Sequence, residues 1–456
     1  MTASSPSASL SPAVAAVLAD LGDVPVVTDR AAVRRRSRDF FWYSPILNVE
    51  LNGLAAEAIA RPRTEADVVT VAGACARHGV PLTVRGGGTG NYGQAVPLKG
   101  GILLDMTALD AVEWVKPGAV RVQAGKNILA LDMETRESGW ELRMHPSTKR
   151  TATIGGFIAG GSGGVGSVSY GGLREPGNLH AVRVVTVEET PRILELRGND
   201  AQVVNRAYGT TGIITALELP LAPAFAWVDV IVAFDDFMDA AAFGLALANA
   251  DGITKKLVTP ISWPLPSYFP ALGVACPEGK HLLVAMIAPH SLESFKALLS
   301  LHTGVQTYEA PSDESATATP LYEYAWNHTT LQVLKVDRGV TYLQCLYPAD
   351  RVLESVAEIR ALFGDEVIPH LEFIRFNGRI TCSALPVVRY TTPERLNEII
   401  DIHEAHGVFI ANPHVFTLED GSRHKRVDAD QLGFKQSIDP KGLLNPGKMR
   451  TFVPVA

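Results

Sequence analysis

The order of hydrophobic and polar residues along the chain predicts a mixed fold of helices and strands. Over residues 64–78, the apolar side chains of Val68, Val71 and Cys75 recur at helical spacing, and Gly79 takes the C-cap position. Short apolar runs between glycines and prolines predict strands. In the first half of the chain we expect a helical lead-in over 13–60, strands over 81–85, 102–105, 111–115, 119–124, 180–187, 192–196 and 213–220, and helices over 127–138 and from Thr153 onward.

The apolar and proline-rich run 219–223 predicts a boundary, after which helices and strands alternate in a second unit. The Ser-, Thr- and Pro-rich run 310–320 predicts a surface loop. In this unit we expect strands over 229–234, 282–288 and 370–379, a hairpin of 331–336 with 340–347, and helices over 238–250, 292–301 and 351–363. The fold class is therefore α+β. At 456 residues the chain exceeds one typical hydrophobic core, which favours two domains.

Two glycine-rich stretches, residues 85–93 and 145–171, are the most informative feature of the chain. Bare backbone N–H groups approach a ligand closely and form concavities that suit phosphates. Each stretch contains a G-x-G-x-x-G match. No helix follows either match, which disfavours a nicotinamide-binding Rossmann site. The alternative is that these glycines only form tight turns and bind no ligand. The two stretches predict opposite walls of a cleft for a large phosphate-bearing cofactor.

Five motifs in a fixed order carry a family resemblance. They are Arg61–Val69, Arg85–Gly90, Pro146–Ser147 with Thr153–Gly156, Tyr208–Thr215 and Asp439–Lys448. In this order the chain resembles the vanillyl-alcohol oxidase and p-cresol methylhydroxylase superfamily of FAD-dependent oxidoreductases, to which glycolate oxidase and D-lactate dehydrogenase subunits belong. The resemblance implies a PCMH-type FAD-binding domain over 1–220, a substrate or cap domain over the flavin at 221–402, and a return to the FAD domain over 403–456.

The resemblance also implies which residues bind FAD. Residues 85–91 resemble the diphosphate loop, the segment 146–156 resembles the wall along the ribityl chain and flavin ring, and 162–166 continues that wall. Residues 212–214 resemble the piece near the adenine, and Asn445 resembles a C-terminal residue that approaches the cofactor, although Asn-Pro-Gly turn chemistry also explains it. The expected cofactor-binding residues are Arg85, Gly86, Gly87, Gly88, Thr89, Gly90, Asn91, Pro146, Ser147, Thr148, Ile154, Gly155, Gly156, Ser162, Gly163, Gly166, Gly212, Ile213, Ile214 and Asn445.

Departures from the family pattern bear on how the flavin is attached and on which substrates the chain could oxidise. Thr89 stands where many relatives carry a histidine bonded to the flavin, so we expect non-covalent FAD, with attachment through His145 or a cap histidine left open. The segment 373–380 lacks the metal-ligand motif of the D-lactate and glycolate branch, so we expect no metal. The segment 411–414 keeps a histidine but lacks the Tyr-Arg pair that holds a phenolate in the phenol-oxidising branch.

Five residues are candidates for catalysis. Oxidation of an alcohol needs a base near the hydroxyl, and histidine suits this role because its pKa lies near neutrality. His414 is the first choice, and Tyr324 and His328 are the second. Arg375 and Arg379 stand four apart in an expected strand, where they share one face and could clamp a carboxylate. Structural roles stay open for each of them. The i, i+3 pair at 403 and 406 does not match a zinc motif.

Composition fits an enzyme that acts on a small molecule. The net charge of −7 argues against a nucleic-acid surface, and the four scattered cysteines do not indicate a disulfide framework. We expect no membrane span, an N-terminal tail over 1–12 instead of a signal peptide, and a cytoplasmic protein that could form a homodimer.

The predicted function is oxidation of a small alcohol or hydroxy acid by hydride transfer to flavin N5. Attack on a benzylic or allylic carbon and a flavin-binding protein without turnover are the alternatives. The electron acceptor (oxygen, quinone or another partner) stays open; Ala95, at a position tied to oxygen access, leans toward a dehydrogenase.

Overall fold

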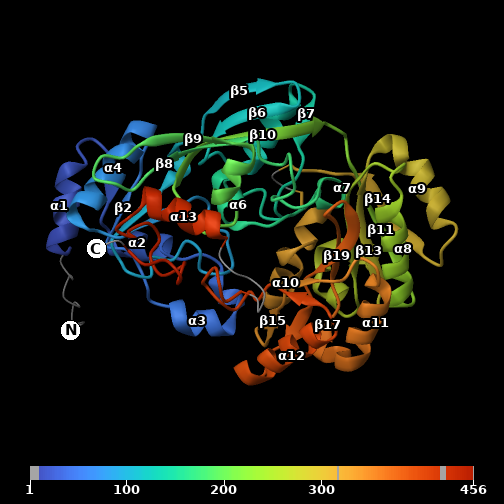
Figure 1. Ribbon diagram of the computed structural model, residues 1–456. Coiled ribbons are helices and arrows are strands. Elements are labelled where there is room, and N and C mark those ends of the chain that lie inside the picture. Colours follow the sequence, from blue (N-terminus) through green and yellow to red (C-terminus); the bar gives the residue numbers. More distant parts are fainter. Residues whose placement is uncertain (1–9, 316–317, 422–427, 455–456) are drawn as a thin grey trace, which may run out of the picture.

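The structure is a computed structural model that describes residues 10–315, 318–421 and 428–454. Most of the expected N-terminal tail, residues 1–9, lies outside these ranges. Helices and strands are mixed throughout, which confirms the α+β class (Figure 1). The first 220 residues form the left-hand part of the view, and residues 228–410 form most of the right-hand part.

A small sheet opens the left-hand part. Its strand order is β1-β2-β4-β3, with β2, β3 and β4 parallel and β1 antiparallel at the edge. The helix predicted over 64–78 is confirmed: Thr64 caps its first turn, and Gly79 ends it at φ 64°. The elements are α1 (Pro12–Asp20), β1 (Val26–Val27), α2 (Arg30–Arg36), α3 (Pro45–Leu51), β2 (Ala58–Ala60), α4 (Glu65–His78), β3 (Leu82–Arg85) and β4 (Ile102–Asp105).

A second, antiparallel sheet has the order β5-β6-β10-β8-β9, and β7 pairs with the far end of β10. Helix α6 packs closely on this sheet, because the Gly155 amide donates to the Ala124 carbonyl, and a Cβ on Gly155 would lie only 2.6 Å from the Ala124 Cβ. The elements are β5 (Val112–Lys116), β6 (Ala119–Gln123), α5 (Ile128–Arg136), β7 (Trp140–Leu142), α6 (Ile154–Gly160), α7 (Ser167–Tyr170), β8 (Ala181–Val185), β9 (Ile193–Arg197) and β10 (Ile213–Pro223).

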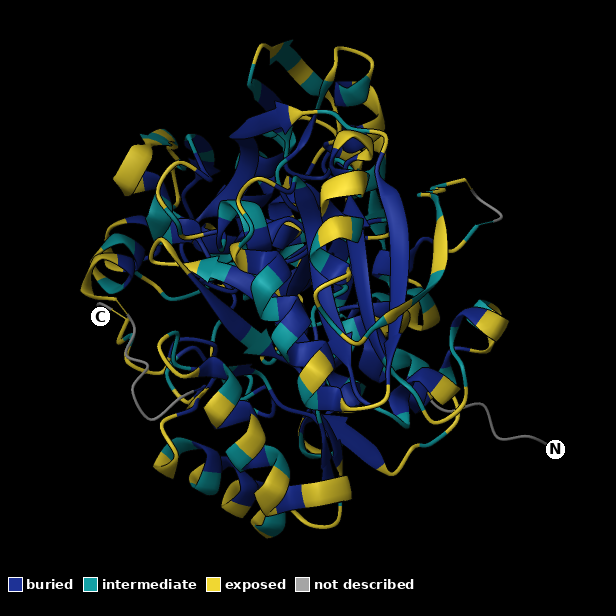
Figure 2. Cartoon of the chain, turned by 90° about the vertical axis from the view of Figure 1, so that its right-hand side faces the viewer, coloured by how far each residue is buried: buried dark blue, intermediate teal, exposed yellow. Residues whose placement is uncertain are grey.

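The right-hand part holds three further sheets, ordered β12-β13-β11-β14, β15-β20-β17 and β18-β19-β16-β21. Figure 2 shows their buried strands behind helices whose outer faces are exposed. The elements are β11 (Val228–Phe234), α8 (Phe237–Asn249), β12 (Lys255–Ile261), β13 (His281–Ile287), α9 (Leu292–Leu299), β14 (Val305–Pro311), α10 (Asn327–Leu334), β15 (Val340–Tyr342), β16 (Cys345–Leu346), α11 (Val352–Phe363), β17 (Val367–Ile368), β18 (Leu371–Phe376), β19 (Arg379–Ala384), β20 (Val387–Arg389), α12 (Pro393–Ala405) and β21 (Phe409–Ile410).

The expected hairpin over 331–347 is wrong. Residues 331–334 belong to helix α10, and β15 and β16 join two different sheets. A short apolar run does not distinguish a buried strand from a helix by periodicity, and here tertiary packing decides.

The strand expected over 370–379 is also interrupted. Asn377 and Gly378 have positive φ angles of 48° and 77° and turn the chain between β18 and β19. Asn-Gly between apolar strands is a strong hairpin signal, and the prediction of one continuous strand did not take it into account.

The C-terminal segment runs back to the left-hand part. Helix α13 (Ala429–Ile438), red in Figure 1, lies beside the second sheet, and the Val187 amide donates to the carbonyl of Ile438. Leu444 forms a parallel bridge with Leu82 at the start of β3. This long-range pairing brings the Asp439–Lys448 motif next to the first glycine-rich loop.

Candidate active site

One cavity collects most of the expected cofactor-binding residues. Both glycine-rich stretches, the segment after α6 and part of the right-hand unit line it. Of the residues expected to bind the cofactor, the lining includes Arg85, Gly86, Gly87, Gly88, Thr89, Gly90, Asn91, Pro146, Ser147, Thr148, Gly155, Gly156, Ser162, Gly163, Gly212 and Ile214. The two glycine-rich stretches therefore do face one shared space.

The first wall is the loop that follows β3. Within the described part of the chain, the amide N–H groups of residues 87–91 donate to no protein acceptor. Such a row of unpaired N–H groups suits the oxygens of a phosphate chain. A Cβ on Gly87 would overlap the Thr151 carbonyl oxygen, and one on Gly86 would overlap the Thr153 hydroxyl. Glycine thus lets the first loop lie directly against the second.

The second wall begins at Pro146 and includes the N-terminus of α6. Thr153 is the N-cap of this helix, and its hydroxyl accepts from the Gly156 amide at 3.4 Å. Gly164 also lies tight against backbone, because its Cβ would overlap the His145 carbonyl oxygen. The absence of side-chain bulk along this wall leaves room for the diphosphate and ribityl chain expected of FAD.

Four of the expected cofactor residues lie outside the lining. Ile154 and Ile213 are buried in the apolar core beneath the walls, and Gly166 takes φ 105° against the Arg143 carbonyl. The Asn445 amide group donates to the Gln94 carbonyl at 3.0 Å and to the Tyr208 carbonyl, while its Oδ1 has no partner among the described residues. Asn445 thus ties two lining segments together.

The right-hand unit closes the cavity with mostly uncharged side chains, which are Trp326, Asn327, His328, Leu331, Gln344, Ser383 and Leu385. Trp326 precedes α10 with φ 52°, a left-handed conformation that is rare for a non-glycine residue. Its indole N–H and the Asn327 Oδ1 are buried without a hydrogen-bond partner among the described residues. Two unsatisfied polar atoms in a cavity wall point to contacts with a bound molecule.

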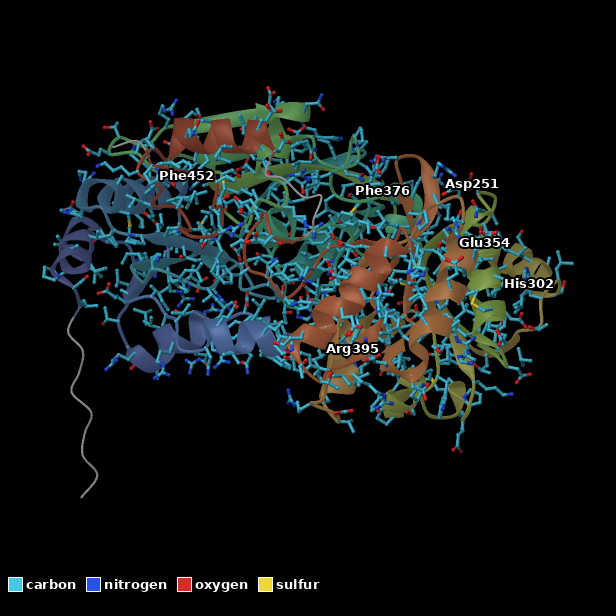
Figure 3. The ribbon with its side chains drawn as sticks, turned by 60° about the horizontal axis from the view of Figure 1, so that its bottom comes forward. Asp251, His302, Glu354, Phe376, Arg395 and Phe452 are labelled. Carbon is cyan, nitrogen blue, oxygen red and sulfur yellow. The ribbon has the colours of Figure 1, made fainter. Side chains whose placement is uncertain are left out.

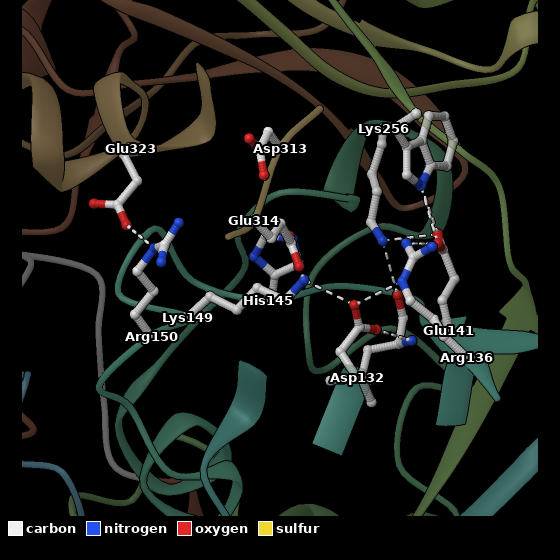
Figure 4. Close-up of polar contacts among 12 residues, drawn as sticks. Asp132, Arg136, Glu141, His145, Lys149, Arg150, Lys256, Asp313, Glu314 and Glu323 are labelled. Carbon is white, nitrogen blue, oxygen red and sulfur yellow. Dashed lines mark hydrogen bonds and ion pairs between the residues drawn. The ribbon is translucent and has the colours of Figure 1, made fainter. Parts of the chain in front are cut away.

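His328 is the histidine among the described residues that line this cavity. Its Nδ1 lies 3.3 Å from Glu323 Oε2, an ion-pair distance without hydrogen-bond alignment. Glu323 Oε1 in turn lies 3.0 Å from Arg150 Nε, as Figure 4 shows. No hydrogen bond to a described residue engages Nε2 of His328.

His414, the first choice from the sequence, lies outside the lining of this cavity. It is buried, with Nδ1 at 2.8 Å from Ser44 Oγ and Nε2 at 2.9 Å from the Tyr342 carbonyl oxygen. Burial lowers the pKa of His414 to about 4. Both ring nitrogens are therefore occupied by protein groups.

Tyr324 is also buried outside the lining, and its ring packs 5.1 Å from that of Phe269. His145 lies behind the second wall, where its ring meets Tyr322 edge-on at 4.9 Å. Burial lowers the pKa of His145 well below its usual value. Neither side chain reaches the space that the glycine-rich loops enclose.

Arg375 and Arg379 do not share a face of one strand as expected. They stand at the ends of β18 and β19, one on each side of the Asn377–Gly378 turn. Arg375 pairs with Asp251 at 2.8 Å on the surface. Figure 3 shows Asp251 at the edge of the right-hand part. The Arg375 carbonyl oxygen faces Gly171 at the end of the second glycine-rich stretch, but neither arginine lines the cavity. The two arginines are not brought together as a carboxylate clamp in the cavity.

Sequence reasoning missed several lining residues, namely Asp39, Phe40, Tyr43, Tyr92, Arg206 and Gln344. Asp39 accepts from the amides of Phe41 and Ala95, so it ties the N-terminal segment to the first loop. Burial raises its pKa to about 6, against the opposing charge of Lys448. The aromatic run at residues 40–43 is the sequence signal that could have indicated this wall.

A buried ion-pair network lies behind the second wall (Figure 4). Lys149 Nζ contacts Asp132 at 2.7 Å and Glu314 at 2.6 Å, and Lys256 Nζ contacts Glu141 at 2.7 Å. Arg136 bridges Asp132 and Glu141. Lys256 and Glu314 come from the right-hand unit, whereas the other members lie on α5, on β7 and in the segment after β7. Charged contacts therefore join the two parts of the molecule beside Pro146.

Comparison with known proteins agrees with this cavity. Residues 56–195 match the family model of the FAD binding domain. An uncharacterized FAD-linked oxidoreductase of Mycobacterium tuberculosis is 30% identical over 165 residues, which is 36% of this chain and 35% of that protein. The glycolate oxidase subunit GlcD of Escherichia coli is 28% identical over 224 residues, covering 46% of this chain and 44% of the relative. The matches thus span less than half of these relatives.

A solved structure titled alkyldihydroxyacetonephosphate synthase has a TM-score of 0.72 at 17% identity, covering 97% of this chain and 87% of that one, and it shows a shared fold. The predicted resemblance and FAD as the cofactor are confirmed. The chain contains an FAD-binding domain over residues 56–195 and is similar to proteins named as FAD-linked oxidoreductases and as a glycolate oxidase subunit.

No group of three or more metal-ligating side chains occurs among the described residues. In the same ranges, no helix is long and apolar enough to cross a membrane.

Proposed function

We propose that this chain oxidises a small organic alcohol or hydroxy acid, with His328 as the base that takes the hydroxyl proton. The carrying observation is the position of His328 in the lining of the FAD cavity with Nε2 unengaged by the described residues. His414 offers no such nitrogen, because both of its ring nitrogens contact protein oxygens or hydroxyls.

The geometry supports a simple division of roles. Glu323 faces His328 Nδ1, which favours a proton on that nitrogen and leaves Nε2 to accept the substrate proton. The Trp326 indole N–H and the Asn327 Oδ1 would orient the substrate through hydrogen bonds. Bound FAD supplies the hydride acceptor, the flavin N5. Leu331 and Leu385 in the same wall would exclude water from the reacting carbon.

This proposal uses the domain division predicted from the sequence. Residues 1–220 and 403–456 would bind FAD, and residues 221–402 would act as a cap that contributes the base. The cap wall of the cavity and the return of Leu444 to β3 support this division. We further propose a cytoplasmic enzyme that binds FAD non-covalently through a cavity in which Thr89 replaces the linking histidine.

An aromatic substrate attacked at a benzylic or allylic carbon is a second candidate. The aromatic side chains of Phe40, Tyr43, Tyr92 and Trp326 in the lining favour it. Such rings offer offset or edge-on contacts to a substrate ring. The glycolate oxidase subunit among the relatives favours the hydroxy-acid candidate instead.

The test is anaerobic mixing of the holoprotein with a panel of alcohols, 2-hydroxy acids and benzylic alcohols, followed by the loss of oxidised flavin absorbance. With a reducing substrate, His328→Gln should lower the rate of flavin reduction about 10²- to 10⁴-fold while FAD stays bound. His414→Gln should keep the wild-type rate within a few-fold. The reverse pattern would return the base to His414. Flavin that dithionite reduces but that no substrate in the panel reduces would favour a binding protein without turnover.

A further inference from the structure

Arg206 is a cation in the cavity lining with no carboxylate at ion-pair distance among the described residues. Its Nε is buried without a hydrogen-bond partner there, and its guanidinium contacts the Tyr208 side chain. Its backbone takes φ 53°, as does that of Tyr208. Left-handed non-glycine residues persist where the surroundings fix them, and they cluster at ligand sites.

A second arginine stands close to this one. Arg174 donates to the Asn205 carbonyl at 2.9 Å. Burial, and then the neighbouring charge of Arg206, lower the pKa of Arg174, with Asp428 as the weaker opposing charge. Two guanidinium groups that share a partly buried space repel each other unless an anion lies nearby.

The other cation in the lining is already engaged. Arg85 donates to the carbonyls of Arg38 and Gly87, at 2.5 and 3.3 Å, and the charges of Asp39 and Asp105 act on it. The described wall from the right-hand unit contributes no lysine or arginine to the cavity. Arg206 is thus the lining cation whose charge the described protein groups leave uncompensated.

We propose that Arg206 binds an anionic oxygen of the molecule held in this cavity, either a phosphate oxygen of FAD or a carboxylate oxygen of the substrate. A guanidinium presents a planar set of N–H donors that matches phosphate and carboxylate geometry. Binding of an FAD phosphate requires only that the chain binds FAD. Binding of a substrate carboxylate rests also on the function proposed above, so the test measures binding and not turnover.

The first arm measures retention of FAD. Holoprotein of the wild type, Arg206→Met and Arg206→Lys is diluted and filtered, and the dissociation constant of FAD is obtained from flavin fluorescence. If the phosphate is the source, Arg206→Met weakens FAD binding at least 10-fold, and the lysine variant recovers part of the loss. Arg197→Met, an exposed arginine on β9, is the matched control and should retain FAD as the wild type does.

The second arm titrates each FAD-loaded protein with glycolate, oxalate and the neutral propane-1,2-diol, and follows the flavin spectrum. If a substrate carboxylate is the source, Arg206→Met keeps FAD but weakens binding of the two acids at least 10-fold, with the diol unchanged.

Equal FAD affinity together with equal responses to the acids, including no response in either protein, overturns the proposal. If Arg206→Met does not fold, Arg206→Gln replaces it and is held to the same two outcomes. Failure of flavin reduction by every alcohol, with the binding differences intact, would refute the proposed reaction and leave the anion site standing.

Discussion

His328 Nδ1 lies 3.3 Å from Glu323 Oε2 across the turn that starts helix α10. The sequence Tyr-Glu-Tyr-Ala-Trp-Asn-His places these two residues five positions apart, and the left-handed Trp326 folds the chain so that they meet. His328 lines the cavity, whereas Glu323 lies outside its lining.

We expect Glu323→Gln to slow flavin reduction about 10-fold, because the neutral amide no longer favours a proton on the facing nitrogen of His328. The loss should appear in kcat while KM and FAD content stay near wild-type values, and Glu323→Asp should recover part of the rate. Rapid mixing under anaerobic conditions measures it. A change confined to FAD content would mean that Glu323 only supports the fold through Arg150.

Gly87→Ala should weaken FAD binding at least 10-fold. The added Cβ would overlap the Thr151 carbonyl oxygen, which belongs to backbone and cannot rotate away, so the two loops must separate. Fluorescence titration with FAD measures the change. Gly433→Ala on α13 meets nothing within 4 Å and is the matched control, expected to bind FAD normally.

Acid precipitation of the holoprotein should release the yellow colour into the supernatant. Thr89 cannot form the bond that a histidine forms at this position, and His145 lies behind the wall, outside the lining. Absorbance of the pellet and supernatant measures the release. Colour retained in the pellet would direct the search for a covalent link to His328.

His414 should make the protein less stable in mild acid. Its pKa is about 4 in the folded protein and about 6.5 in the unfolded chain, so the unfolded chain binds the extra proton first as the pH falls. The free energy of unfolding should therefore decrease between pH ~6.5 and pH ~4, by about 3 kcal/mol from this residue. Urea unfolding followed by circular dichroism measures it.

The variant His414→Gln should reduce this pH dependence, whereas His406→Gln, at an exposed position, should leave it as in the wild type. An unchanged slope in His414→Gln would show that another buried group dominates the acid response.

Lys149→Met should destabilise the protein by about 3–5 kcal/mol, because it leaves the Asp132 carboxylate buried without its nearest cation. Chemical denaturation of the FAD-loaded protein measures the loss. The exposed pair of Lys280 with Asp235 provides the control, and Lys280→Met should change stability by about 0.5 kcal/mol or less. A small effect of Lys149→Met would indicate that the remaining lysine and arginine compensate Asp132.

Local chemistry explains what could be predicted from sequence. The helix over 64–78 carries its own cap, and the glycine loops specify where backbone is bare, so the cofactor class and most of the first two walls followed from adjacent residues. The prediction of a strand at 331–336 was wrong because Leu331 and Leu334 suit a buried helix as well as a strand. The predicted arginine clamp does not form because the Asn377–Gly378 turn reverses the chain between Arg375 and Arg379.

By itself the sequence determined an α+β protein with two backbone-lined walls for a phosphate-bearing cofactor, because glycine, proline and capping residues act within a few positions of where they stand. The family resemblance then specified FAD. Only the tertiary structure decided which histidine faces the cavity. His328 and His414 look alike as isolated residues, but the Ser44 hydroxyl and the Tyr342 carbonyl, 370 and 72 positions away along the chain, occupy both nitrogens of the second. The same long-range packing brings Leu444 to Leu82 and leaves Arg206 in the lining without a carboxylate partner among the described residues.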